Sequence, residues 1–296
     1  MEGRSFAPAY WTRVAVATGL AVAVCNVLTT GFSAQQPAAQ QAAPAPRVRF
    51  NTIAERFEKG EPSFNGEAWE NLPDQEHSAF RLDDLEAALA ALKPAGAPRP
   101  LRTPVVRIQY EADQDYKHVV KQLLDVGVMG IIVPGVETAE QALYLVRSMR
   151  YPPQRTTKPQ FREPPGFRGY APGLAVAYWG WTPNDYAAGA DTWPLNPDGE
   201  LMAIAMIETP MAVRNIRKIL GVPGLGAILI GQGDLSMAIG VGNPGAVANH
   251  PEVEAQVAEV AKACVEMKKL CGSYQGDVNT RLAQGFRLFT SQRPKS

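Results

Sequence analysis

The chain has 296 residues, of which 46% are hydrophobic, and its 29 basic side chains balance its 29 acidic ones. This composition is typical of a globular protein with one large domain or two small ones. The sequence has no basic patch with interleaved aromatic residues, so composition and charge argue against a nucleic-acid-binding protein.

The N-terminal segment differs from this average. Arg4 and Arg13 precede an uncharged segment, residues 14–34, which ends in small residues. This is the pattern of a secretory signal peptide. Uncleaved, the segment is just long enough to span a bilayer, but its Thr, Gly and Asn residues make it a poor anchor. We therefore predict a cleaved signal peptide over residues 1–34 and export to the periplasm or outside the cell. No stable membrane span remains after cleavage, and an uncleaved anchor is the less favoured alternative.

A compositional change follows the predicted signal peptide. Residues 35–47, QQPAAQQAAPAPR, have no apolar periodicity and are rich in Ala, Gln and Pro, which predicts a disordered linker. The remaining residues, 48–296, match the size of a single (β/α)8 barrel. We interpret them as one folded domain.

The first third of this domain contains an acid and a histidine close together. Residues 63–69, SFNGEAW, predict a first strand. The segment DQEH, residues 74–77, then lies in a polar loop before a predicted helix. The apolar face of that helix consists of Leu82, Leu85, Ala88, Leu89 and Leu92. Asp74 could orient His77 and raise its basicity, as a general base requires. From the residues alone, two polar surface side chains are the favoured interpretation.

The next segment is a β-branched strand, TPVVRIQY, with Arg107 inside it. A charged group in an apolar strand is costly unless it is paired or used. An internal salt bridge and a role in binding substrate are the two interpretations.

Further along, strands alternate with helices of about ten residues, which predicts a parallel α/β fold. The long segment 151–186 is rich in Pro, Gly and Arg, and its aromatic residues either line a pocket or pack against their own domain.

A strand–helix–strand unit lies between Leu201 and Gly240. Its first apolar run ends at Glu208, a helix is predicted over residues 212–220, and its second apolar run ends just before Asp234. Because such strands lie side by side, their carboxyl ends open onto one rim, where two carboxylates could share a hard divalent cation such as Mg²⁺ or Mn²⁺. Alternatively, Asp234 caps a helix that starts near Leu235, and Glu208 is a solvated loop acid. The pattern alone favours neither interpretation.

The remaining cysteines and histidines receive structural interpretations. Cys25 would leave with the signal peptide. Cys264 and Cys271 could form a disulfide in an exported protein. Because Cys264 lies in a helical pattern and Cys271 begins the next strand, we instead predict two buried free thiols. Their spacing does not resemble a zinc site. His118, in a surface helix, and His250, in a loop, are interpreted as structural or solvated.

Several segments together resemble one protein family. MIETPMAVRNI and GLGAILIGQGDLSMAIG are similar to the signature of the HpcH/HpaI aldolase/citrate lyase family, the class II metal-dependent pyruvate aldolases. Further similar segments, from roughly residue 50 to residue 291, are GVMGIIVPGVETAEQA, RYPP, GFRGYAP and AQGFRLF. The resemblance implies a (β/α)8 TIM-type barrel that cleaves or forms 4-hydroxy-2-oxo acids, giving pyruvate plus an aldehyde. It also implies a homo-oligomer, a trimer or a hexamer.

The resemblance also implies roles for particular residues. Glu208 and Asp234 would hold the divalent metal, Mg²⁺, Mn²⁺ or Co²⁺, and Arg107 would stabilise the enolate oxygen. The segment DQEH falls on the family motif D-x-x-H, in which Asp74 orients His77 and His77 moves the proton. The backbone N–H groups near Gly233 and Asp234 would bind the substrate carboxylate.

Three features depart from the family pattern. Relatives carry a further helix and strand between the segments that correspond to SFNGEAW and DQEH, where this chain has only ENLP. The barrel must therefore be irregular near its first strands, either rerouting SFNGEAW or leaving a gap. In addition, Met206 replaces a glutamine and GQGD replaces G-P-[SA]-D.

Two alternative functions follow from these features. The shortened start favours a degenerate, non-catalytic protein that binds metal and a 2-oxo acid. A citrate-lyase-type enzyme acting on a thioester is the other alternative, and export argues against it because thioester cofactors are intracellular.

Overall fold

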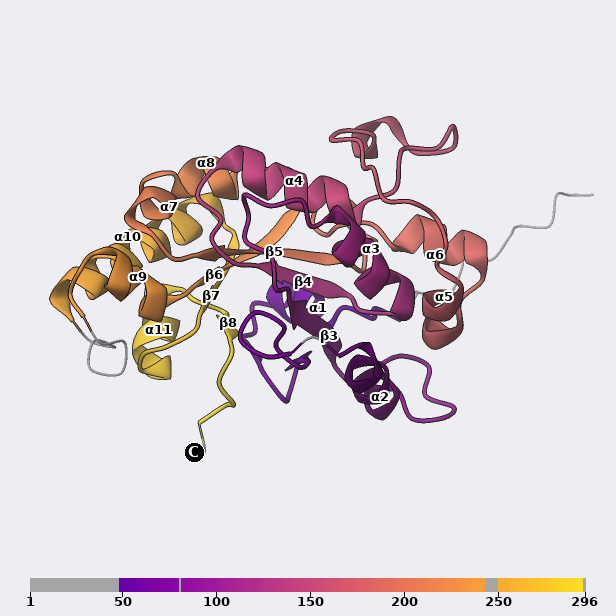
Figure 1. The fold of residues 1–296 in the computed structure, drawn as a ribbon, viewed down its shortest axis with the longest axis horizontal. Helices are drawn as coiled ribbons and strands as arrows, with labels where there is room; N and C mark the ends of the chain where they lie inside the picture. Colours follow the sequence, from indigo (N-terminus) through magenta and orange to yellow (C-terminus); the bar gives the residue numbers. More distant parts are fainter. Residues whose placement is uncertain (1–47, 80, 243–249, 295–296) are drawn as a thin grey trace, which may run out of the picture. The chain divides into compact units, whose positions relative to one another are not determined.

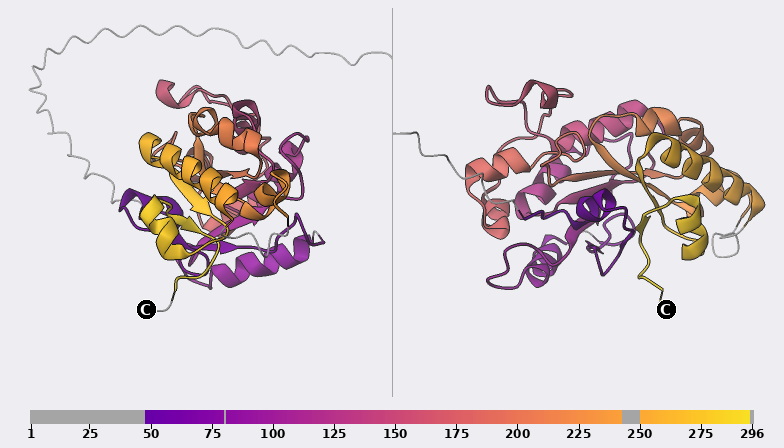
Figure 2. Two further views of the ribbon diagram at one scale, coloured as in Figure 1. Left: turned by 90° about the vertical axis from the view of Figure 1, so that its left-hand side faces the viewer. Right: turned by 180° about the vertical axis from the view of Figure 1, so that it is seen from behind.

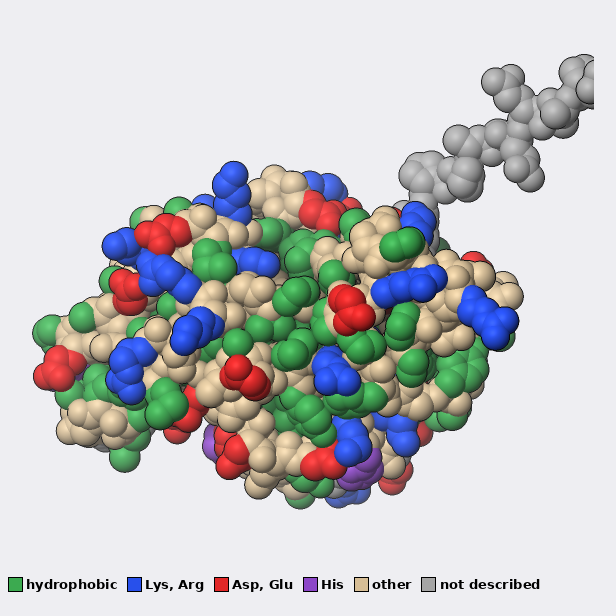
Figure 3. Space-filling view, turned by 90° about the horizontal axis from the view of Figure 1, so that it is seen from above, with side chains coloured by type: hydrophobic (Ala, Val, Ile, Leu, Met, Phe, Trp, Pro, Cys, Tyr) green, Lys and Arg blue, Asp and Glu red, His purple; other side chains and the backbone are tan. Residues whose placement is uncertain are grey.

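The computed structural model describes residues 48–79, 81–242 and 250–294. The predicted signal peptide and linker lie outside these residues. The described residues form one compact unit. Within the described part of the chain, no helix is both long enough and apolar enough to cross a membrane. On the face shown in Figure 3, basic and acidic side chains are interspersed, in keeping with the balanced composition.

The core of this unit is one sheet of eight parallel strands (Figure 1), paired in the order β1-β8-β7-β6-β5-β4-β3-β2. The strands are β1 (Ser63–Phe64), β2 (Trp69–Asn71), β3 (Thr103–Arg107), β4 (Gly130–Val133), β5 (Met202–Ile207), β6 (Leu225–Ile230), β7 (Leu270–Ser273) and β8 (Leu288–Phe289). They form a nearly closed barrel with one unsealed seam, between β1 and β2. The predicted (β/α)8 TIM-type barrel, irregular near its first strands, is therefore confirmed.

The seam lies where the sequence is shortened. The segment SFNGEAW does not form one strand as predicted but divides into β1 and β2, which share one isolated bridge, Asn65 to Trp69, instead of a ladder. The reason is length, because a crossover between parallel strands usually needs a dozen or more residues. Trp69 is fully buried, and its Nε1 donates a hydrogen bond to the carbonyl of Phe289 in β8 at 3.1 Å. This bond links β2 to β8 beside the seam.

The central strands are apolar on both faces, as expected for a parallel sheet covered by helices. Along β5, Met202, Ile204 and Met206 belong to a cluster inside the barrel, and the residues between them belong to the core under the helices. A short helix before the barrel, α1 (Thr52–Glu58), adds Ile53 and Ala54 to the interior cluster. Its Thr52 backbone N–H donates to Thr103 Oγ1 at the start of β3, at 2.8 Å. Helix α1 therefore covers the amino-terminal end of the barrel.

The other helices lie around the outside of the strands, as Figure 2 shows. They are α2 (Leu82–Leu92), α3 (Lys117–Val126), α4 (Ala139–Met149), α5 (Gly173–Trp179), α6 (Pro183–Gly189), α7 (Pro210–Arg214), α8 (Ile216–Leu220), α9 (Gln232–Ala238), α10 (Pro251–Met267) and α11 (Val278–Gln284), with a 3-10 turn, η1, at Pro159–Phe161. The helix predicted over residues 212–220 is divided at Asn215 into α7 and α8.

The aromatic residues of segment 151–186 pack against their own domain. Trp179 is buried, and its ring contacts those of Phe50, Trp181 and Tyr186. Its indole N–H also donates to the carbonyl of Gly127 at 3.1 Å. Of the two interpretations left open for these residues, the structure therefore supports the packing role.

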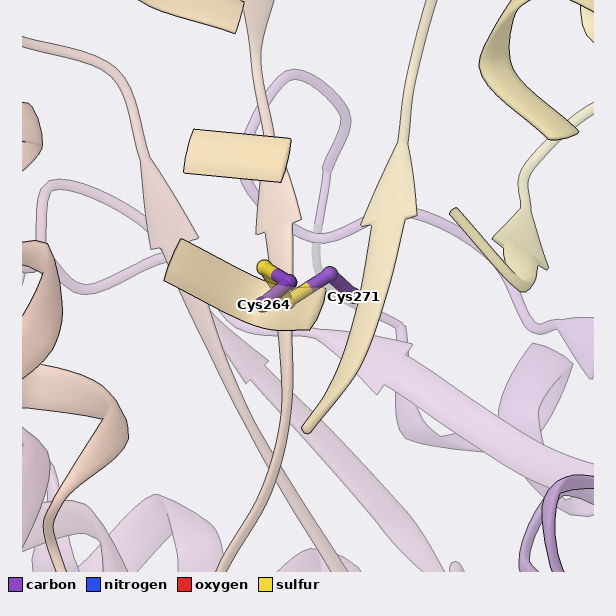
Figure 4. The surroundings of a disulfide bond; sticks show 2 residues. All are labelled: Cys264 and Cys271. Atoms are coloured by element: carbon purple, nitrogen blue, oxygen red, sulfur yellow. A yellow bond between two sulfur atoms is a disulfide. The ribbon is translucent and has the colours of Figure 1, made fainter. Parts of the chain in front are cut away.

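The two cysteines near the carboxyl end of the chain are joined. Cys264 and Cys271 form a disulfide between α10 and β7 (Figure 4), so the prediction of free thiols is wrong. The reason is the turn between the two elements, where Lys268 has φ 53° in the left-handed region and reverses the chain after α10. This reversal brings the two Cα atoms to 6.1 Å, within the range of a disulfide.

Candidate active site

The predicted site residues gather at the carboxyl ends of the strands, the face where barrel enzymes carry their active sites. A cavity of about 150 Å³ opens there. Its lining consists of His77, Arg107, Met206, Gly231, Gln232, Gly233, Asp234, Tyr274 and Gln275. Residues from β3, β5, the first turn of α9 and the loops after β2, β6 and β7 therefore share one cavity.

Arg107 ends β3, and its side chain is held by two carboxylates. Its Nε donates to Asp74 Oδ1 at 2.9 Å, its Nη2 donates to the other oxygen of Asp74, and its Nη1 lies 2.6 Å from Glu76 Oε2. Burial alone would raise the pKa of Asp74, but the hydrogen bonds and charge of Arg107 outweigh burial and lower it. The salt bridge considered for Arg107 is thus present, and the same side chain also lines the cavity.

The segment DQEH reaches this rim although the chain before it is short. The backbone N–H of Leu72 donates to Val105, and that of Gln75 donates to Arg107, at 2.9 and 3.1 Å. These hydrogen bonds hold residues 72–75 alongside β3 as far as the carboxyl end of that strand. The shortened segment therefore still places His77 at the cavity.

His77 has a different neighbour from the one predicted. Its imidazole is 66% exposed, and its Nε2 lies 3.5 Å from Glu76 Oε1. Among the described residues, the carboxylate of Asp74 makes its side-chain hydrogen bonds to Arg107 rather than to His77. The physical reason is that a guanidinium can donate two parallel hydrogen bonds to one carboxylate, which an imidazole cannot. Asp74 therefore positions Arg107 in this structure, and Glu76 is the acid beside the histidine.

Glu208 follows β5 and is 5% exposed, so it is not the solvated loop acid considered above. One carboxylate oxygen, Oε2, accepts the backbone N–H of Gly135 at 2.9 Å, whereas Oε1 is buried without a hydrogen-bond partner in the described part of the chain. The pKa of Glu208 is raised to about 8, first by burial and also by the nearby acids Asp234 and Glu76, against the opposing hydrogen bond from Gly135. The surroundings of Glu208 thus disfavour an isolated negative charge.

Asp234 lies in the first turn of α9, whose N-cap is Gly231, so it does not cap a helix that starts near Leu235. Its carboxyl group interacts with that of Glu208, and it lines the cavity. The glycine at the end of β6 allows this approach, because a Cβ on Gly231 would lie 2.6 Å from Glu208 Oε1. The two acids predicted from the strand ends therefore come together as expected from the strand pairing.

The carboxylate pair fits a hard divalent cation. The described residues contain no group of three or more His, Cys, Asp or Glu side chains arranged as metal ligands. Two carboxylates, with one buried oxygen that lacks a donor, nevertheless provide the oxygen ligands that Mg²⁺ or Mn²⁺ prefers. Water or substrate oxygens supply the remaining ligands in such sites.

Some residues of the site were missed from the sequence. Glu76 is inside the DQEH segment, and Tyr274 directly follows β7, so position at a strand end was the available signal. Gln232 of GQGD is fully buried, and its amide bonds to Ser273 Oγ at 2.5 Å and to the backbone of Gln275 at 2.8 and 3.1 Å. Gln232 therefore joins the loops after β6 and β7, a role its motif does not indicate.

Comparison with known proteins agrees with this geometry. The family model for HpcH/HpaI aldolase/citrate lyase matches residues 74–280. The chain is 35% identical over 207 residues to a hydroxypyruvate/pyruvate aldolase of Cupriavidus necator, covering 70% of this chain and 65% of that protein. It is 32% identical over 219 residues to a 2-dehydro-3,6-dideoxy-6-sulfogluconate aldolase of Pseudomonas putida, covering 73% of each.

A solved structure gives the same result for the fold. A HpcH/HpaI aldolase/citrate lyase family protein from Burkholderia cenocepacia superposes with a TM-score of 0.63 at 26% identity, covering 81% of this chain and 92% of that one. The chain therefore belongs to the HpcH/HpaI aldolase/citrate lyase family.

Proposed function

We propose that this protein is a metal-dependent aldolase that cleaves or forms 4-hydroxy-2-oxo acids, giving pyruvate plus an aldehyde. The observation that carries the proposal is that Asp234, Arg107 and His77 line one small rim cavity, with the buried Glu208 interacting with Asp234 beside it. A divalent cation held by Glu208 and Asp234, Mg²⁺, Mn²⁺ or Co²⁺ in type, would polarise the oxo group of the substrate.

The protein's own groups bind and orient the 2-oxo acid. The backbone N–H groups of Gly233 and Asp234 lie in the first turn of α9, where N–H groups have no intrahelical partner, and they can receive the substrate carboxylate. Arg107 faces the cavity with its position set by Asp74 and Glu76. Its guanidinium stabilises negative charge that develops on the oxo oxygen, without needing to reorganise during the reaction.

His77 is the group that we assign to proton transfer. In the cleavage direction the C4 hydroxyl loses its proton to the imidazole, and the C3–C4 bond breaks to give the aldehyde. The bonding electron pair passes into the enolate of pyruvate, and a proton delivered to C3 completes pyruvate. The imidazole lines the cavity beside Glu76, which suits a base that must exchange protons with substrate and solvent.

The alternatives are less well supported. A non-catalytic binding protein was favoured by the shortened start, yet that start brings His77 to the cavity. A citrate-lyase-type thioester enzyme is less favoured because the similar curated proteins quoted above are named as aldolases.

The test is release of pyruvate from a panel of 4-hydroxy-2-oxo acids, with Mg²⁺, Mn²⁺ or Co²⁺ and with a chelator. We expect metal-dependent release that is lost in Glu208→Gln and strongly reduced in His77→Ala. The matched control is His118→Ala, which removes an exposed histidine of α3 outside the cavity. No release by the wild-type protein, together with metal-dependent binding of pyruvate, would refute the aldolase and support the binding protein.

We also propose export through a signal peptide and assembly as a trimer or hexamer. The Cys264–Cys271 disulfide supports export, because disulfides persist mainly in oxidising compartments. The intact mass of the secreted protein tests cleavage after residue 34, and light scattering of the purified protein tests the assembly.

A further inference from the structure

Tyr274 lines the cavity, but the proposed reaction assigns it no role. It directly follows β7 and lines the cavity together with Met206. Its backbone is held on two sides, since its N–H donates to Ile230 at 3.1 Å and its carbonyl accepts from Thr290 Oγ1 at 3.1 Å. The guanidinium carbon of Arg107 lies 5.4 Å from the centre of its ring. The ring is therefore held in place next to the group that faces the substrate.

The hydroxyl of Tyr274 is free to bind a ligand. In the described ranges of the chain it has no hydrogen-bond partner, although the ring is half-buried. Burial raises the pKa of Tyr274, against the opposing charge of Arg107, so the phenol stays protonated. The amide of Gln232, also at the cavity, is already engaged by Ser273 and Gln275. The phenol of Tyr274 is thus a neutral hydrogen-bond donor. It is not one of the groups that we assign to binding the oxo-acid end of the substrate.

The size and lining of the cavity restrict which substrate groups can contact the Tyr274 hydroxyl. Its volume of about 150 Å³ is well below the range of roughly 300–1,000 Å³ typical of pockets for drug-sized ligands. The enclosed space suits a short aldehyde beside pyruvate. An alkyl group placed against the phenol would leave its hydroxyl unpaired, which is unfavourable in a partly buried site, whereas a substrate hydroxyl would pair with it.

We propose that Tyr274 is a specificity residue whose hydroxyl binds a hydroxyl group on the aldehyde portion of the substrate, so that the enzyme prefers short hydroxylated aldehydes over alkyl aldehydes of the same size. This inference rests on the proposed aldolase function.

Two aldehydes of equal heavy-atom number test the preference directly. Glycolaldehyde and propanal differ only in a hydroxyl in place of a methyl group, and each can be added to pyruvate in the presence of Mg²⁺ or Mn²⁺. We expect a higher kcat/KM for glycolaldehyde with the wild-type protein. Tyr274→Phe should lower that value about 5- to 15-fold, the loss expected for one hydrogen bond, and leave propanal within about twofold. The matched control is Tyr170→Phe, because Tyr170 is 58% exposed and lies outside the cavity lining.

A reaction that needs no aldehyde separates this inference from the proposed function. Exchange of the pyruvate methyl hydrogens with deuterated water, followed by NMR, should be metal-dependent and equal in the wild-type protein and Tyr274→Phe. Absence of exchange and of addition in the wild-type protein would refute the aldolase itself. Exchange together with an unchanged preference in Tyr274→Phe, or with no preference in the wild-type protein, would refute the role of Tyr274. Loss of exchange in Tyr274→Phe would also refute it, because the phenol would then act on the oxo acid.

Discussion

Replacing Glu208 with glutamine should stabilise the protein while it removes activity. Glu208 is 5% exposed, and its Oε1 has no hydrogen-bond partner among the described residues. Its pKa is raised from the usual 4.5 to about 8, mainly by burial and also by the neighbouring acids. Between these pH values the folded protein binds more protons than the unfolded chain, so the free energy of unfolding falls as pH rises from about 4.5 to about 8. Glutamine carries no charge, so Glu208→Gln should lose this dependence.

The size of the effect follows from the pKa. At roughly 1.4 kcal/mol per pKa unit, ionising Glu208 in the folded protein costs at most about 5 kcal/mol. The interior relaxes around a charge, so we expect a measured gain of about 1–3 kcal/mol for Glu208→Gln at pH 8. The hydrogen bond from Gly135 can be kept, because the glutamine side chain retains one carbonyl oxygen.

Urea unfolding at pH 5 and pH 8, with a chelator and without reductant, measures the difference. The variant should gain stability over the wild-type protein as pH rises, and the gain should shrink when Mg²⁺ or Mn²⁺ is added, since only the wild-type pair is neutralised by the cation. Glu86→Gln, on the exposed face of α2, is the matched control and should show no pH-dependent difference. Equal pH slopes for Glu208→Gln and the wild-type protein would refute the reasoning.

Three further substitutions test other parts of the structure. Asp74→Asn should lower kcat for pyruvate release about tenfold or more, because its carboxylate holds Arg107, and should leave the pH profile unchanged; a shifted profile would show that it acts on the histidine instead. Cys264→Ser should lower the free energy of unfolding by about 2 kcal/mol, and dithiothreitol should have a similar effect on the wild-type protein only; an unaltered wild-type protein in dithiothreitol would contradict this. Trp69→Phe should cost about 1 kcal/mol in urea unfolding, because it removes one hydrogen bond to the Phe289 carbonyl, which still accepts the backbone N–H of Asn65; equal stability would show that the bond beside the seam contributes nothing.

The features that could be predicted correctly from the sequence are those set by residues that lie close together along the chain. The alternation of apolar strands and amphipathic helices indicated the barrel, and the strand ends at Glu208 and Asp234 indicated the acid pair. The start of α4 is also set locally, since Thr138 forms a capping box with Gln141 three residues later. These features follow from periodicity, capping and the rule that parallel strands open onto one rim, all of which can be read along the chain.

Tertiary structure decided which side chains meet. The sequence motif paired Asp74 with His77, but Arg107, 33 residues away, takes both carboxylate oxygens. The hydrogen bond beside the seam joins Trp69 and Phe289, which are 220 residues apart. A left-handed turn at Lys268 brought together two cysteines that their separate elements had suggested were unpaired. The physical reason is the same in all three cases. A side chain pairs with the group that offers the better bonding geometry in the packed fold. That geometry is set by tertiary contacts, which leave no signal in the local sequence.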